Sequence, residues 1–66
     1  MNEVELYLKK AGQDLQYLMQ GAMQYGVAFL EELASKALAE NKKIIWKERY
    51  VDTQDLGLLD YELQPI

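Results

Sequence analysis

Cysteine and histidine are both absent from this chain of 66 residues. A disulfide is therefore impossible, and a structural zinc site lacks the ligands from which such sites are built. A single short domain buries only about 60% of its unfolded surface, so it usually needs a disulfide, a metal or self-association to be stable. With the first two removed, we expect association with another copy or with a partner.

The same absences exclude the common arrangements of catalytic side chains. No nucleophile can be paired with a histidine base, and Ser35 and Thr53 are the only hydroxyls apart from the tyrosines. The carboxylate pairs Glu31–Glu32 and Asp52–Asp55 are better explained by a helix surface and by a turn, because neighbouring helix residues point in different directions. We therefore expect no enzyme, no cofactor and no metal.

Charge is missing from one long stretch and is unevenly distributed elsewhere. LQYLMQGAMQYGVAFL, residues 15–30, contains no charged side chain, but it is shorter than the roughly 20 apolar residues that a membrane helix needs. The net charge of −4 disfavours nonspecific binding to nucleic acid, although residues 42–51 are locally basic. The segment MNEVELYL has no basic region before an apolar one, so we expect a cytoplasmic protein without a membrane segment.

What is present is a heptad-like pattern of apolar and small residues. From Val4 to Phe29, these residues follow one another at steps of three and four positions. Two steps of four positions then lead to Leu33 and Ala37. This pattern predicts one long amphipathic helix over about residues 2–40, with an apolar stripe too long for the rest of the chain to cover. We expect a homo-oligomer whose interface is formed by Val4, Leu8, Ala11, Leu15, Leu18, Ala22, Gly26, Phe29, Leu33 and Ala37.

A helical hairpin broken near Gly21 is the alternative. Gly21 could end a helix in the left-handed conformation, but no Asn, Asp, Ser or Thr lies between Asp14 and Ser35 to cap a second helix. The apolar pattern also keeps its phase through Gly21 and Gly26, and a glycine inside a helix costs only about 1 kcal/mol. The continuous helix is therefore the preferred prediction.

Glutamines form a neutral polar stripe along the same stretch. They follow one another at helical spacing as Gln13, Gln16, Gln20 and Gln24. The stripe is either a solvated surface or a face covered in an assembly, where amides hydrogen-bond at a lower desolvation cost than ions.

The chain changes character after Asn41, a residue that readily takes the left-handed conformation that ends a helix. IIWKERYV, residues 44–51, is rich in β-branched and aromatic residues, and LLDYEL, residues 58–63, alternates apolar and acidic side chains. We predict a C-terminal β-hairpin within residues 42–66, connected by DTQDLG. The alternative is that residues 42–51 continue the helix. With the hairpin, which is the preferred prediction, the chain is a single domain, mainly α with a small β element.

The hairpin contains the strongest candidate for contacts with a partner. KKIIWKERY interleaves basic and aromatic side chains, which suits phosphate contacts and base stacking. The competing interpretation is a strand whose aromatic residues pack on the helix. Its cations would then pair with Asp60 or Glu62 of the second strand. The candidate partner-binding residues are Lys42, Lys43, Trp46, Lys47, Arg49 and Tyr50.

These patterns predict a small, acidic, non-enzymatic protein that binds other proteins as an adaptor, an assembly subunit or an inhibitor. The size would suit an accessory protein of a phage or plasmid. One alternative is a nucleic-acid-associated regulator that uses residues 42–50. A second is an oligomer that sequesters a small ligand among glutamine amides and tyrosines.

Overall fold

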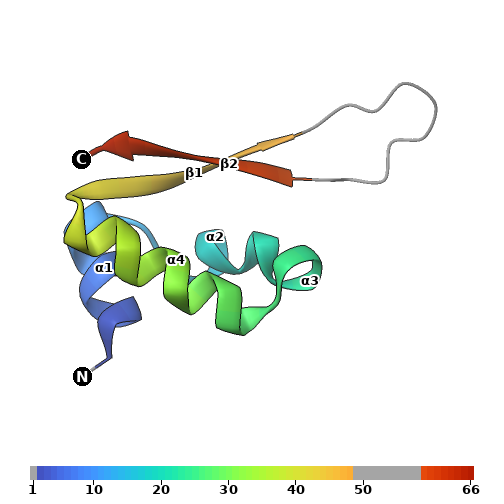
Figure 1. The fold of residues 1–66 in the computed structure, drawn as a ribbon, viewed down its shortest axis with the longest axis horizontal. Coiled ribbons are helices and arrows are strands. Elements are labelled where there is room, and N and C mark those ends of the chain that lie inside the picture. Colours follow the sequence, from blue (N-terminus) through green and yellow to red (C-terminus); the bar gives the residue numbers. More distant parts are fainter. Residues whose placement is uncertain (1, 49–58) are drawn as a thin grey trace.

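The computed structural model describes residues 2–48 and 59–66. This part of the chain is mainly helical, and a two-stranded antiparallel sheet at its C-terminal end lies along one side of the helices (Figure 1). The element order is α1 (Glu3–Ala11), α2 (Leu15–Leu18), the 3-10 turn η1 (Met19–Gly21), α3 (Ala22–Tyr25), α4 (Val27–Ala39), β1 (Lys42–Glu48) and β2 (Leu59–Pro65). The predicted fold class, mainly α with a small β element, is confirmed.

The predicted single helix over residues 2–40 is wrong, because the chain first turns at Gly12. This glycine has a φ of 69°, and the N–H of Gln13 donates to the carbonyl of Leu8 at 3.0 Å, which closes α1 with a left-handed cap. Asp14 then starts α2, since its side chain accepts a hydrogen bond from the N–H of Tyr17 at 2.8 Å. The residue that caps the helix after the first break is therefore Asp14, which precedes Gly21 in the chain.

Gly26 makes the second break. Its φ of 85° and ψ of 154° are values that essentially only glycine adopts. Its N–H donates to the carbonyl of Ala22 at 2.8 Å, and its carbonyl accepts from the N–H of Leu30 at 3.2 Å, so α3 ends where α4 begins. Gly21 instead has a φ of −88° and a ψ of 0° between η1 and α3. The alternative helical hairpin is therefore wrong about the place of the break.

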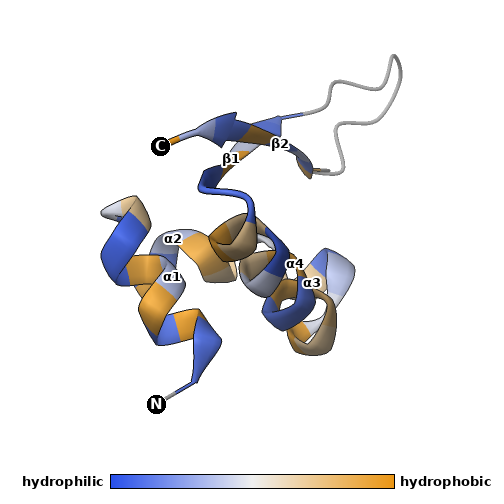
Figure 2. Ribbon diagram, turned by 60° about the vertical axis from the view of Figure 1, so that its left-hand side comes forward, coloured by the Kyte–Doolittle hydropathy of each residue, from blue (hydrophilic) through white to orange (hydrophobic). Residues whose placement is uncertain are grey.

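These breaks let the helices fold back on one another and share a core with the hairpin. α1 and α4 pack together, and the hydroxyl of Ser35 on α4 donates to the carboxylate of Glu3 on α1. Figure 2 shows hydrophobic residues on every helix, while both strands mix hydrophobic with hydrophilic residues. The buried core consists of Tyr7, Leu18, Leu30, Leu33, Ala34, Ala37, Ile44 and Trp46. The apolar stripe is thus divided among helices that cover one another, which a straight rod could not do.

The predicted C-terminal β-hairpin is confirmed, and so is the left-handed residue before it. Asn41 has a φ of 58° and follows the end of α4. The strands pair in a register that sets Ile44 opposite Leu63 and Trp46 opposite Tyr61. Because Ile44 and Trp46 are buried in the core, these cross-strand pairs occupy the face of the sheet that lies on the helices.

The intervening residues of each strand occupy the outer face of the sheet. They include Lys47, which is paired in register with Asp60. The predicted connection DTQDLG and the candidate residues Arg49 and Tyr50 lie outside the described residues.

Candidate functional site

Side chains from the helical layer hydrogen-bond to the backbone of β1. The N–H of Ile44 donates to the hydroxyl of Tyr7 at 2.7 Å, and this hydroxyl donates to Oε1 of Gln13 at 2.5 Å. Nε2 of Gln13 completes the ring by donating to the carbonyl of Ile44 at 2.7 Å. The N–H of Trp46 donates to the hydroxyl of Tyr17 at 3.0 Å. The edge of β1 that faces away from β2 is therefore closed by side chains of the same chain.

Tyr7 is fully buried at the centre of this ring. Burial raises the pKa of its hydroxyl above the ordinary 10.0, because it outweighs the lowering by the hydrogen bond from Ile44, and Tyr17 raises the pKa further. The group therefore stays a neutral hydroxyl at neutral pH. It can then accept from the strand and donate to Gln13 at the same time.

A second clamp holds the start of β2. Oε1 of Gln24 accepts from the N–H of Leu59 at 2.8 Å, and Nε2 of Gln24 donates to the carbonyl of Leu59 at 2.9 Å. The hydroxyl of Tyr25 donates to the same carbonyl at 2.6 Å. Two members of the glutamine stripe, Gln13 and Gln24, thus bond to the chain's own strands. Gln13 is half-buried, whereas Gln16, Gln20 and Gln24 are exposed.

Sequence reasoning found the glutamines but not the tyrosines of these clamps. Helical spacing identified the amides, and one of its two interpretations gave them hydrogen-bonding partners, although in an assembly. No pattern in the sequence distinguishes Tyr7, Tyr17 and Tyr25, which bond to a strand, from tyrosines that only pack. Their partners lie about thirty residues or more away in the chain, so only the fold brings the groups together.

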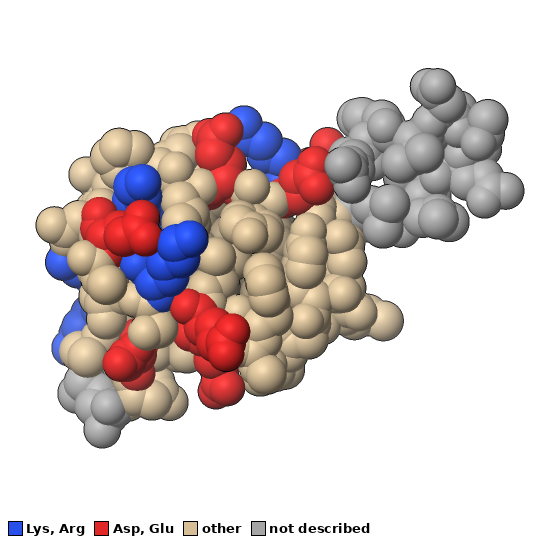
Figure 3. Space-filling model, in the orientation of Figure 1, with Lys and Arg blue, Asp and Glu red and all other residues tan. Residues whose placement is uncertain are grey.

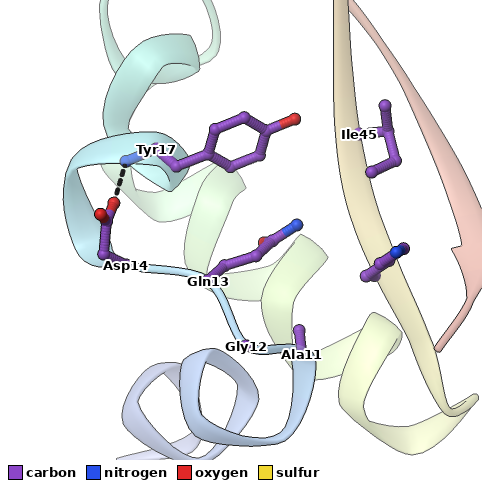
Figure 4. Close-up of a pocket in the computed structure, with 7 residues that line it drawn as sticks. Ala11, Gly12, Gln13, Asp14, Tyr17 and Ile45 are labelled. Atoms are coloured by element: carbon purple, nitrogen blue, oxygen red, sulfur yellow. Dashed lines mark hydrogen bonds between the residues drawn. The ribbon is translucent and has the colours of Figure 1, made fainter.

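A hollow of about 330 Å³ lies beside the clamped edge of β1. Figure 4 shows the side chains of Tyr17 and Gln13 extending towards the strand, while Asp14 turns back to cap α2. The hollow is lined by Ala11, Gly12, Gln13, Asp14, Tyr17, Lys43 and Ile45. Because the amide of Gln13 and the carboxylate of Asp14 already bond to the chain, this hollow consists largely of groups that hold the fold.

Trp46, a candidate partner-binding residue, is buried with only 9% of its surface exposed. Its ring stacks on Tyr25 with 5.9 Å between centroids and meets Tyr61 edge-on at 6.2 Å. The ring also lies directly against Gly21, where an added Cβ would be 2.6 Å from Cζ2 and 2.9 Å from Cζ3. The interpretation of this aromatic residue as packing on the helices is therefore confirmed.

The lysines of the same segment lie at the surface. Lys47 forms the predicted ion pair with Glu62, with Nζ 3.0 Å from Oε1, and Lys42 lies 3.4 Å from Glu40. Lys43 is half-buried beside the hollow at the β1 edge. The pair of Lys47 with Glu62 confirms that the local positive charge is offset within the hairpin. A role for these residues in binding a partner stays a prediction.

The residues predicted to form an oligomer interface are distributed between the core and the surface. Leu18, Leu33 and Ala37 are buried within the chain. Leu15 and Gly26 are exposed. The half-buried members, which pack against the core or beside it, are Val4, Leu8, Ala11, Ala22 and Phe29. The association of these residues with another copy stays a prediction, and Leu15 is the member that offers it the most accessible apolar surface.

Large apolar side chains are exposed along the stretch without charge. Leu15, Met19, Met23 and Val27 are 51%, 36%, 102% and 50% exposed, and we call these four residues the uncharged helical face. The first three recur at every fourth residue through α2, η1 and α3, and Val27 opens α4. Figure 3 shows charged side chains gathered over the later part of α4 and over the hairpin, with few where α3 and the start of α4 lie.

Comparison of the chain with protein-family models, with curated proteins and with solved structures gave no match. Among residues 2–48 and 59–66, no helix combines the length and hydropathy needed to cross a bilayer. The chemistry of the surface is therefore the guide to function.

Proposed function

We propose that this chain is a small non-enzymatic protein-interaction protein that associates with itself through the uncharged helical face. The observation that carries the proposal is the exposure of Leu15, Met19, Met23 and Val27. Large apolar side chains that stay exposed close together along the chain are found at sites where proteins bind one another. Methionine side chains also adapt to the shape of a partner, because they are unbranched and flexible.

The energetics favour covering this face. Complete burial of one large apolar side chain contributes about 1.5–3 kcal/mol, so four such side chains supply enough to offset part of the cost of association. The net charge of −4 does not oppose close approach here, since residues 15–30 contribute nothing to it. Two copies can therefore bring these faces together without placing like charges in contact.

The nucleic-acid alternative has weaker support. The ring of Trp46 would have to leave the core before it could stack on a base, and Lys47 is already paired with Glu62. A binding mode built on phosphate contacts would make affinity fall steeply with salt. Titration with an oligonucleotide at two salt concentrations separates this mode from association through apolar surface.

Light scattering and sedimentation of the purified chain at micromolar concentration test the proposal. We expect a particle larger than the 7.7 kDa monomer, and we expect Met23→Glu to dissociate it because the charge would have to be buried. Leu6→Glu is the matched control, since Leu6 is an exposed apolar residue on α1, outside the face. A stable 7.7 kDa particle for the unmodified chain, or equal dissociation by both variants, would contradict the proposal.

A further inference from the structure

The register of the hairpin determines which backbone groups of β2 face outward. The N–H groups of Ile44 and Trp46 bond to tyrosine hydroxyls and not to β2. In an antiparallel ladder both members of such a pair direct their N–H and C=O groups away from each other. Tyr61 and Leu63, which pair with these residues, therefore present their backbone groups at the outer edge of β2.

This edge is open in its middle. Leu59, at the start of β2, is clamped by Gln24 and Tyr25. No hydrogen bond joins the outward groups of Tyr61 and Leu63 to another residue in the described ranges 2–48 and 59–66. Proteins usually cover or blunt strand edges, because unpaired N–H and C=O groups are a template for another strand. The outer edge of β1 is closed by side chains of Tyr7, Gln13 and Tyr17, whereas the backbone groups of Tyr61 and Leu63 at the outer edge of β2 have no such partners among the described residues.

A groove accompanies the open edge on the side of the helices. Phe29, Glu32, Leu33 and Lys36 of α4 line a hollow of about 180 Å³ together with Tyr61. Side chains of an added strand that point towards the helices would enter this groove, next to the half-buried ring of Phe29. Phe29, Leu33 and Tyr61 offer apolar side chains of moderate size a surface to pack on, whereas Glu32 and Lys36 give the same groove charged walls.

On the outer face of the sheet, β2 carries two carboxylates beside Lys47 of β1. Asp60 and Glu62 belong to the outer face of the sheet because they alternate with Tyr61 and Leu63. Glu62 is exposed, and its pKa is lowered by a hydrogen bond from Gln64 and by Lys47, so it stays ionised at neutral pH. Side chains of an added strand that lie on the outer face would therefore be close to Glu62, whose side chain is 47% exposed although it pairs with Lys47.

We propose that the open edge of β2, with its groove on α4, binds an extended peptide segment of another protein in which apolar and basic residues alternate. The apolar residues occupy the groove, the basic residues lie beside the exposed carboxylate of Glu62, which they share with Lys47, and the backbone bonds to Tyr61 and Leu63. A second copy is a poorer occupant. Pairing β2 with itself would bring acidic residues of both copies together on one face, and like charges across strands are destabilising.

Hydrogen exchange followed by NMR tests the proposal with the blocked peptide lysine-valine-lysine-valine-lysine. We expect the amide hydrogens of Tyr61 and Leu63 to exchange at least about tenfold more slowly when the peptide is in excess. The amide hydrogens of Ile44 and Trp46 are the internal control, because tyrosine hydroxyls already hold them in the free chain.

Two control peptides separate the backbone and charge contributions. Methylating the nitrogens of both valines removes the donors that would face β2, and replacing lysine with glutamate reverses the charge; both changes should abolish the protection. Glu62→Gln should weaken binding several-fold, whereas Glu5→Gln on α1 should not. Equal protection by all three peptides, or none by any, would overturn the proposal.

The same measurement distinguishes the peptide from a second copy of the chain, and peptide binding from self-association through the uncharged helical face. Protection of Tyr61 and Leu63 that increases with protein concentration in the absence of peptide would identify a second copy as the occupant and overturn the proposal. Met23→Glu should leave peptide binding unchanged, because Met23 is neither on β2 nor in the groove. Failure of self-association through the uncharged helical face therefore leaves this test intact.

Discussion

Replacing Gly21 with alanine should destabilise the protein, although the backbone conformation there suits alanine. With a φ of −88° and a ψ of 0°, the exchange would by itself stabilise the fold by about 0.4–1 kcal/mol, through the lower entropy of the unfolded chain. The added methyl group, however, would lie 2.6 Å from Cζ2 and 2.9 Å from Cζ3 of Trp46. Overpacking of this kind costs about 1–3 kcal/mol.

The ring of Trp46 has little room to move away. The ring stacks on Tyr25 and makes an edge-to-face contact with Tyr61, and the backbone N–H of Trp46 is held by the hydroxyl of Tyr17. We therefore expect a net loss of about 1–2 kcal/mol in the free energy of unfolding, out of a total near 3–10 kcal/mol for a chain of 66 residues. For a domain of this size the midpoint of thermal unfolding should fall by about 4–16 °C.

Urea unfolding followed by the fluorescence of Trp46 and by far-ultraviolet circular dichroism measures this loss. The cause can be isolated by repeating Gly21→Ala in a Trp46→Phe background, where the smaller ring leaves space for the methyl group. The Trp46→Phe single variant also accounts for the indole N–H, which is buried and has no hydrogen-bond partner among the described residues. We expect the cost of Gly21→Ala to shrink or to change sign there. An unchanged cost in both backgrounds, or a stabilising effect beside Trp46, would refute the reasoning.

Asp14→Ala should lower the free energy of unfolding by about 1 kcal/mol because α2 loses its cap; a neutral result in urea unfolding would mean that the cap contributes nothing. Gly26→Ala should cost about 1–3 kcal/mol although no atom crowds the site, because the strain is in the backbone; D-alanine, placed there by chemical synthesis, should be tolerated, and equal losses for both isomers would disprove this cause. Tyr7→Phe should cost about 1–3 kcal/mol at neutral pH, since the buried N–H of Ile44 loses its acceptor. The pKa of Tyr7 is raised in the folded state, so its contribution is complete below pH 10.0 and declines as the pH rises towards the folded pKa, because the unfolded chain releases the proton first. Unfolding experiments on both sides of pH 10.0 should therefore show that the free energy of unfolding falls less at alkaline pH for Tyr7→Phe than for the unmodified chain. Equal falls would contradict a raised pKa of Tyr7 in the folded state.

The open edge of β2 could have been partly anticipated from the sequence. Proline at position 65 is compatible with a strand only where no N–H is needed, which marks an edge position or one outside the ladder. The register that places Tyr61 and Leu63 at the same edge depends on how the strands pair, and the groove depends on where α4 lies. Those two features required the tertiary structure.

Local sequence determined the character of each half of the chain. The β-branched and aromatic residues after Asn41, and the alternation before Pro65, were enough to predict the hairpin, because strand preference is a property of neighbouring side chains. The packing of Trp46 on the helices and the pair of Lys47 with Glu62 agree with one of the two interpretations that the sequence left open for this segment.

Only the tertiary structure decided what Gly12, Gly21 and Gly26 do. Gly12 and Gly26 turn the chain at positive φ, whereas Gly21 keeps a negative φ and makes room for Trp46, which lies far along the sequence. An apolar pattern that stays in phase cannot reveal these breaks, because separate helices packed around one core can satisfy it as well as one long helix can. The free energy that selects between them comes from contacts between distant residues, and no local stretch of the sequence contains both partners.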